Sequence, residues 1–302
     1  MEIQIIAKEF YEYSIYFKGL SKQTIRRYKY VIDLYVKLSG VGKVTEITQQ
    51  NVHALFFQGR TERKWSANTA IIFHKSLQVF FTWCISKHYM DFNPIHGIDR
   101  PKLEQKLPKK LTKQDALLLL EIVYNYPYTN KFLRIRNHAI FATFIFAGLR
   151  KNELLNLKYT DVDIENMTIF VSQGKGAKDR FVPISQTLAK ILCLYLNERK
   201  RLNRTCPEFF TSLKQNTGLT EHGLKHFVDK IQPVFCKHFS VHKLRHTFAT
   251  LMLEGGCDIY SLSKMMGHSD IKTTTIYLYA SSDHLRSQIG KHPLNEIKTN
   301  QF

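Results

Sequence analysis

The chain has 302 residues and a formal net charge of +19, from 44 lysines and arginines against 25 aspartates and glutamates. This charge implies a polyanionic partner, nucleic acid before an acidic membrane surface, although a basic enzyme without such a partner stays open. Five widely spaced cysteines without a C-x-x-C pair argue against a disulfide framework and a cysteine zinc site, and the apolar runs are too short to span a bilayer.

Residues 1–96 are expected to form a helical domain. Apolar residues recur at three- and four-residue spacing from Ile3 to Phe17 and again from Ile25 to Tyr35. Ser21 and Ser66 each stand where a helix should begin. Basic residues on the predicted polar faces could meet phosphates, although a solvated surface is the simpler explanation for any single one; they are Lys22, Arg26, Arg27, Lys64 and Lys75.

A linker and a second, larger domain follow. Residues 97–110 read GIDRPKLEQKLPKK, which is rich in proline and charge and has no apolar period. Thr112 and Asp115 resemble a capping box at the start of the next helix. The chain therefore divides into a domain at 1–96, a linker at 97–110 and a domain at 111–302.

The second domain reads as mixed α/β. Helices are predicted at 137–147, 188–201 and 221–232, with a last short one at 283–289. Two short strands are predicted at 167–171 and 180–184, joined by a turn rich in glycine and charge that holds Lys175 and Lys178. Lys178 is a sixth candidate for contact with DNA. The fold class is mainly α with a small β-sheet.

The first of these helices ends in Gly148-Leu149-Arg150, with Glu153 three residues further on. Taken alone, Arg150 is a cation placed favourably at a helix carboxy terminus.

The richest stretch runs from residue 241 to residue 280. His242 and Arg245 share a helix face at i and i+3, and glycines then separate them from His268 and Tyr277. The stretch offers cations, imidazoles and a phenol, without a carboxylate pair for a metal or a glycine-rich phosphate loop. Such groups suit a phosphodiester attacked by tyrosine, because arginines match phosphate oxygens and a phenol can form a covalent intermediate.

The order His-x-x-Arg, Gly-His, and Tyr nine residues after that histidine resembles the carboxy-terminal box of the tyrosine recombinases, the phage-integrase and Xer family. Three further segments are similar to that family: Gly-Leu-Arg-x-x-Glu-Leu at 148–154, Gly-Lys-Gly-x-Lys at 174–178 and Ser-Ala-Asn-Thr at 66–69. Because no further domain precedes the helical bundle, we expect a Xer-like recombinase rather than an integrase with an arm-binding domain.

The resemblance implies a site-specific recombinase that cleaves and rejoins DNA strands through a 3'-phosphotyrosyl intermediate, with no cofactor and no metal. It implies catalytic roles for six residues: Tyr277 as nucleophile, Arg150 and Arg245 on the phosphate, Lys175 as general acid, His242 in removing the tyrosine proton and His268 in bonding the phosphate. Tyr279, two residues after the nucleophile, is expected to pack instead.

The same resemblance implies partners and a location. The helical amino-terminal domain would be the core-binding domain, which clamps one side of double-stranded DNA, and the second would be the catalytic domain. We expect a homo-tetramer on synapsed sites, or a hetero-tetramer with a related recombinase, in the cytoplasm at the nucleoid. Dimer resolution, integration and excision of an element, and inversion all stay open.

Three other readings remain. His242 and His246 at i and i+4 could belong to a zinc helix, but Lys243 stands where that motif needs a glutamate. The charge also fits a non-catalytic DNA-binding or architectural protein. A topoisomerase-like or hairpin-forming relative would keep the chemistry and change the outcome.

Overall fold

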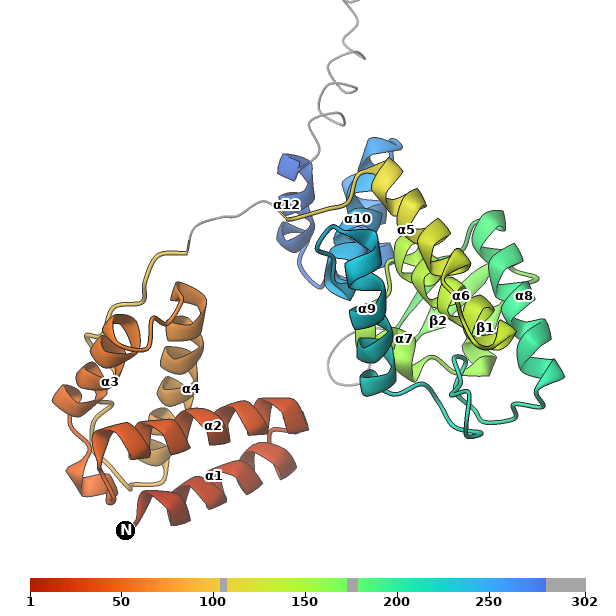
Figure 1. Cartoon of the computed structure of the whole chain (residues 1–302). Coiled ribbons are helices and arrows are strands. Elements are labelled where there is room, and N and C mark those ends of the chain that lie inside the picture. The colour runs from red at the N-terminus through yellow and green to blue at the C-terminus, as the bar shows by residue number, and fades with distance from the viewer. Residues whose placement is uncertain (104–107, 173–178, 281–302) are drawn as a thin grey trace, which may run out of the picture. The chain divides into compact units, whose positions relative to one another are not determined.

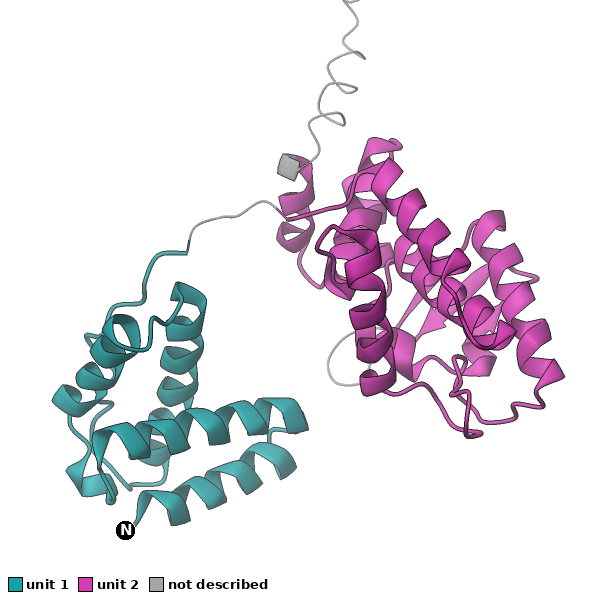
Figure 2. Cartoon of the chain, viewed as in Figure 1, with its two compact units in different colours: residues 1–105 teal, residues 106–302 magenta. Residues whose placement is uncertain are grey.

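The computed structural model describes residues 1–103, 108–172 and 179–280, and Figure 1 shows the course of the chain. The chain separates into two compact units, Met1–Gln105 and Lys106–Phe302, which Figure 2 colours separately.

The described part of the first unit is helical. Its elements are α1 (Ile3–Tyr16), α2 (Lys22–Ser39), η1 (Val44–Glu46), α3 (Gln49–Thr61) and α4 (Ala67–Ser86). Helices α2 and α4 begin where the sequence predicts, because Ser21 and Ser66 each accept a hydrogen bond from the backbone N–H three residues later.

Aromatic side chains form much of the core of this unit. The Phe10 ring lies 5.3 Å from the rings of Tyr28 and Phe80 and 5.4 Å from that of Trp83, centroid to centroid. The apolar spacing of α1 continues to Phe17, but α1 ends at Tyr16 and Phe17 is 81% exposed just beyond it.

Helices make up most of the described part of the second unit. They are α5 (Lys113–Asn125), α6 (Lys131–Ala147), α7 (Lys151–Asn156), α8 (Gln186–Arg201), α9 (Glu221–Phe235), α10 (Val241–Glu254), α11 (Ile259–Met266) and α12 (Lys272–Ala280). Helix α6 contacts α5, α8 and α10, which explains why nearly all of its carboxy-terminal half is buried. It begins six residues before the predicted start, because the Asn130 side chain caps it by accepting from the Phe132 N–H.

A small antiparallel sheet lies beside these helices. Its strands β1 (Val162–Asp163), β2 (Thr168–Val171) and β3 (Arg180–Pro183) are paired in the order β1-β2-β3, after the 3-10 turn η2 (Tyr159–Asp161). Ile169 pairs with Val182 and both are fully buried, whereas Phe181 on the other face is 68% exposed. Strands β2 and β3 confirm the two predicted strands; β1, with two residues, is too short to show a period-two pattern.

Helices α10, α11 and α12 pack together around a separate apolar cluster, whose buried members are Phe248, Ala249, Leu253, Leu262, Met266 and Tyr277. The short helix predicted at 283–289 lies outside the described residues. Among the helices described up to residue 280, none is both long and apolar enough to cross a membrane.

Candidate active site

Two glycines in the left-handed backbone region turn the chain at the centre of the second unit. Gly148 ends α6 with φ of 61°, and a Cβ added there would meet the Phe248 ring at 2.2 Å. Gly267 ends α11 with φ of 64°. Only glycine combines this φ with such a close approach at position 148, so the turn that leads to Arg150 depends on it.

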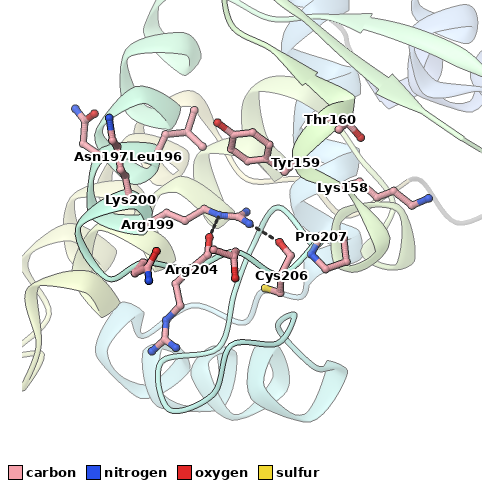
Figure 3. A pocket seen from close by; sticks show the side chains of 12 residues that line it. Lys158, Tyr159, Thr160, Leu196, Asn197, Arg199, Lys200, Arg204, Cys206 and Pro207 are labelled. Carbon is pink, nitrogen blue, oxygen red and sulfur yellow. Dashed lines mark hydrogen bonds between the residues drawn. The ribbon is translucent and has the colours of Figure 1, made fainter.

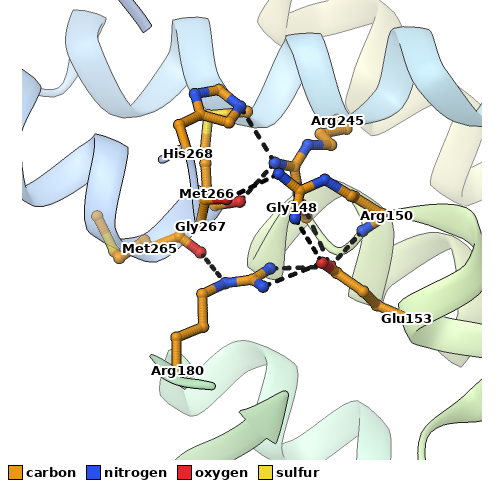
Figure 4. Close-up of polar contacts among 9 residues, drawn as sticks. All are labelled: Gly148, Arg150, Glu153, Arg180, Arg245, Met265, Met266, Gly267 and His268. Atoms are coloured by element: carbon orange, nitrogen blue, oxygen red, sulfur yellow. Dashed lines mark hydrogen bonds and ion pairs between the residues drawn. The ribbon is translucent and has the colours of Figure 1, made fainter. Parts of the chain in front are cut away.

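Glu153 is the hub of the cluster that follows (Figure 4). Its Oε1 accepts from Nη1 of Arg150 at 2.7 Å and from Nη1 of Arg180 at 3.0 Å, and its Oε2 accepts from Nη2 of Arg180 at 2.8 Å. The same guanidinium groups also donate to backbone carbonyls, Arg150 to Gly267 and Arg180 to Met265, each at 2.8 Å. Segments from α7, β3 and the end of α11 are thereby tied together.

Arg245 enters this cluster from α10. Its Nη1 donates to the Gly148 carbonyl at 2.5 Å, and its Nη2 donates to the Met266 carbonyl at 2.6 Å. The guanidinium is 3.9 Å from Glu153 and 4% of the residue is exposed. Arg245 is therefore held by the two turns that end α6 and α11.

The charges in this cluster do not cancel. Burial alone would raise the pKa of Glu153, but its bonds to Arg180 and Arg150 and their charges outweigh burial and lower this pKa to about 2. Burial, together with the neighbouring Arg150, lowers the pKa of Arg245 to about 10, so its guanidinium stays charged at neutral pH. Three guanidinium groups against one carboxylate leave two formal positive charges, which suits an anionic ligand.

Arg150 is the arginine of this group that faces outward, since its side chain is 36% exposed while that of Arg180 is 8% exposed. A guanidinium has five N–H groups, and the described contacts of Arg150 use two of them, on Glu153 and Gly267. Donors therefore remain for a phosphate.

His268 joins the arginines to α12. Its Nε2 lies 3.3 Å from Nη2 of Arg245, and its Nδ1 lies 2.8 Å from Oγ1 of Thr274, which is fully buried. Burial and the positive charges of Arg245 and Arg150 lower the pKa of His268 to about 4. The imidazole is neutral at pH 7 and has one hydrogen-bond donor.

Tyr277 lies on α12 and is 2% exposed. Its Oη is 2.8 Å from Nδ1 of His246, one residue after Arg245 on α10. Burial raises the pKa of Tyr277, while the charges of Arg245 and Arg150 lower it in part. Burial and the neighbouring His242 lower the pKa of His246 to about 4, so this ring is also neutral at pH 7.

Comparison with known proteins decides the family. Residues 109–284 match the model of the phage integrase family, and residues 6–91 match the model of the amino-terminal SAM-like domain of phage integrases. The tyrosine recombinase XerA of Thermococcus onnurineus is 32% identical over 302 aligned positions, which cover 95% of each chain.

The chain belongs to the phage integrase family of tyrosine recombinases.

Other relatives agree with this assignment. The tyrosine recombinase XerD of Listeria monocytogenes is 31% identical and covers 93% of this chain and 96% of its own. The structure of XerH recombinase bound to a palindromic difH substrate has the same fold, with a TM-score of 0.72 over 91% of this chain and 81% of that one, at 22% identity. The two-domain fold expected from the sequence is confirmed, and the protein is an enzyme that cleaves and rejoins DNA.

The fold of this tyrosine recombinase brings together four of the six expected catalytic residues. Arg150, Arg245 and His268 form one connected group. Tyr277 bonds to His246, the residue that follows Arg245 on α10. His242 lies one turn before His246, with ring centroids 5.2 Å apart, and is exposed. The Tyr277 hydroxyl thus contacts His246. The residue expected to remove the tyrosine proton was His242.

Two expected residues cannot be placed. Lys175 and Lys178 lie outside the described residues. The five basic residues singled out in the first unit are all exposed; they are Lys22, Arg26, Arg27, Lys64 and Lys75.

Sequence reasoning missed three residues that the structure places in the candidate site: His246, Arg180 and Thr274. His246 is visible as the fourth residue after His242, but that spacing raised only the question of zinc. Arg180 follows the glycine-rich turn, and no local pattern links it to Glu153, 27 positions earlier. In the described part of the chain, no group of three or more His, Cys, Asp or Glu side chains is placed to hold a metal ion.

A hollow of about 660 Å³ lies elsewhere in the unit, between η2, α8 and the loop after α8 (Figure 3). Arg199 at its wall donates to the carbonyls of Arg204, Cys206 and Glu208, and its guanidinium lies 4.8 Å from the Tyr159 ring. This arginine therefore shapes the loop, and none of the residues that line the hollow belongs to the cluster around Glu153.

Proposed function

We propose that the Arg150–Arg245–His268 group binds the scissile phosphate of a DNA strand and that Tyr277 attacks it. The supporting observation is that Arg245 and His246 are neighbours on α10 while His246 holds the Tyr277 hydroxyl. Helix α10 therefore supplies both Arg245, for the phosphate, and His246, which bonds to the phenol of the same chain.

The chemistry follows from the charges. Attack by Tyr277 forms a phosphotyrosine at the 3' side and releases a 5'-hydroxyl, so the bond energy is kept and no nucleotide is consumed. Arg150 and Arg245 offset the charge that grows on the non-bridging oxygens, and their contacts with Glu153, Gly148 and Gly267 place them before DNA arrives. A second 5'-hydroxyl then attacks the phosphotyrosine and completes the exchange.

Two proton transfers complete this proposal. Lys175 protonates the leaving 5'-oxygen, on the strength of its place in the Gly-Lys-Gly-x-Lys turn. His242 accepts the phenol proton once DNA binding has separated Tyr277 from His246. Exposed His242 suits this role better than His246, whose pKa of about 4 makes it a weak base.

The first domain, 1–96, is proposed as the core-binding domain and residues 97–110 as its linker to the catalytic domain at 111–302. Its exposed basic residues on α2, Lys22, Arg26 and Arg27, would contact DNA phosphates. A tetramer on two synapsed sites, made of this chain or of this chain and a related recombinase, would carry out the exchange. Resolution of dimers, or integration and excision of a mobile element, is the corresponding cellular role.

Covalent trapping tests the proposal. A nicked duplex that loses its short 5'-hydroxyl fragment after cleavage should leave the wild-type protein attached to DNA on a denaturing gel. Tyr277→Phe should bind the same duplex and form no covalent complex, whereas Tyr279→Phe should still form it. Trapping that survives Tyr277→Phe and is lost in Tyr279→Phe would overturn the assignment, and binding without any trapping would favour a non-catalytic DNA-binding protein.

A substrate whose bridging 5'-oxygen is replaced by sulfur tests the general acid. A thiolate leaves without a proton, so this substrate should rescue Lys175→Ala. It should not rescue Arg150→Lys. The reverse pattern would mean that the two roles have been exchanged.

A further inference from the structure

His268 touches a donor on one side of its ring and a hydroxyl on the other. Nε2 faces Nη2 of Arg245 at 3.3 Å, and Nδ1 faces Oγ1 of Thr274 at 2.8 Å. Thr274 is fully buried on α12, three residues before Tyr277. One threonine therefore links Arg245 and His268, through the His268 ring, to the helix that carries Tyr277.

The contacts fix the tautomer of His268 in the DNA-free protein. A guanidinium only donates hydrogen bonds, so Nε2 must accept from Arg245. The neutral ring has a single N–H, which then lies on Nδ1 and donates to the Thr274 hydroxyl.

That tautomer is the wrong one for a bound phosphate. To donate to a phosphate oxygen from its Arg245 side, His268 needs the hydrogen on Nε2, which leaves Nδ1 as an acceptor. A threonine hydroxyl both accepts and donates, and it changes from one to the other by rotating about its C–O bond. Water takes the proton from Nδ1 and supplies one to Nε2 of this half-buried ring, so the charge of the ring is unchanged.

We propose that Thr274 is a positioning residue for strand cleavage, whose hydroxyl accepts from His268 in the free protein and donates to it when the scissile phosphate is bound. This inference rests on the proposed function, in which Arg245 and His268 bind that phosphate. Thr274 and Tyr277 are at i and i+3 and share a face of α12, so the same contact also fixes the rotation of the helix that presents the nucleophile.

Substitutions at Thr274 separate this role from simple packing. Thr274→Val keeps the shape and removes the hydroxyl, and it should slow single-turnover cleavage of the nicked duplex about tenfold or more while the Kd for DNA changes less than twofold. Thr274→Ser keeps the hydroxyl and should stay within about threefold of the wild type. Thr275→Val is the matched control, because the Thr275 hydroxyl bonds to the Lys272 carbonyl of the same helix and to no other group in the described part of the chain.

A double-mutant cycle tests the route through His268. In a His268→Ala background, Thr274→Val should cause no further loss, because its effect acts on the imidazole. Independent, multiplying losses would overturn the proposal, as would a Thr274→Ser variant as slow as Thr274→Val or a Thr274→Val variant as fast as the wild type.

A second readout does not need cleavage. Long-range nitrogen–proton spectra of histidine-labelled protein should show His268 with its proton on Nδ1 in the free state and on Nε2 in the Tyr277→Phe complex with DNA. Persistence of the Nδ1–H form in the complex would overturn the inference. Failure of the wild-type protein to trap DNA would instead count against the proposed function, so the two failures are distinguishable.

Discussion

The hydroxyl of Tyr277 lies 2.8 Å from Nδ1 of His246, and the tyrosine is 2% exposed. A phenol buried in this way cannot meet a DNA strand until the tyrosine or the residues that cover it move. Since the pKa of His246 is about 4 and burial raises the pKa of Tyr277, transfer of the phenol proton to this imidazole is strongly unfavourable. The bond therefore describes a resting state in which His246 holds the nucleophile.

The first prediction concerns this bond. His246→Leu removes the hydrogen-bond partner of Tyr277 and leaves the buried hydroxyl unpaired, which costs on the order of 1–3 kcal/mol. Hydrogen exchange in α12 of the DNA-free protein should rise about tenfold, while single-turnover cleavage should fall less than tenfold. A loss of cleavage as complete as that of Tyr277→Phe would instead assign the proton transfer to His246.

The second prediction concerns the forked geometry of the arginines. Arg150→Lys and Arg245→Lys keep the charge but lose the paired N–H groups, so each should slow cleavage by about a hundredfold, with a much smaller change in DNA affinity. Arg201→Lys on α8 is the control, because Arg201 also donates two N–H groups, from Nε and Nη2, but to Glu198 outside the site. Equal losses in affinity and in rate would show that the two site arginines only bind DNA.

The third prediction concerns stability against pH. His246 and His268 have pKa values near 4 when folded, and an unfolded histidine titrates near 6.5, so the unfolded chain takes up more protons as the pH falls below that value. Their contribution to stability is complete above about pH 6.5 and is lost towards pH 4. Glu153, with a pKa near 2, adds a second loss that begins below its unfolded value of 4.5.

Urea unfolding at pH 7.5 and pH 5 would measure the first of these losses. After allowance for solvent screening of these half-buried rings, we expect about 1 kcal/mol for each histidine at pH 5. His74 and His138, whose pKa values burial also lowers, contribute with the same sign, so the test is the difference between the wild type and a His246→Asn, His268→Asn double variant. An identical pH dependence in both proteins would contradict the assignment.

The fourth prediction concerns salt. If Lys22, Arg26 and Arg27 contact phosphates, replacing each with glutamine should reduce the slope of log affinity against log salt by about 1. Lys8 on α1, which is also exposed, serves as the control. Unchanged slopes for the three α2 variants would remove that helix from the DNA interface.

Much of the fold could be predicted because it rests on local signals. Helix starts at Ser21 and Ser66 depend on a side chain bonding to a backbone N–H three residues away, and the sequence shows both partners. Phe17 shows the limit of this reasoning. Its spacing matches the buried face of α1, but periodicity does not show where the helix ends.

The candidate site was predictable in part for the same reason. His242 and Arg245 lie three residues apart on one helix, so a motif can place them together, and the spacing from His268 to Tyr277 is fixed along the same stretch of chain. The contacts that orient them join distant positions: Glu153 to Arg180 across 27 residues and Tyr277 to His246 across 31. Such pairs depend on how β3 and α12 pack against the rest of the domain, and the periodicity of apolar residues along the sequence does not show this packing.

Gly148 contacts both Arg245 and the apolar cluster that buries Tyr277, and its lack of a Cβ makes this possible. Its carbonyl holds Arg245, and its Cα faces the Phe248 ring so closely that a Cβ would lie 2.2 Å from it. Phe248 belongs to the apolar cluster that buries Tyr277. Alanine at position 148 would therefore displace Arg245 and Tyr277 together. A genetic screen for variants that bind DNA but never cut it should recover changes at this glycine, although it has no side chain that could take part in the reaction.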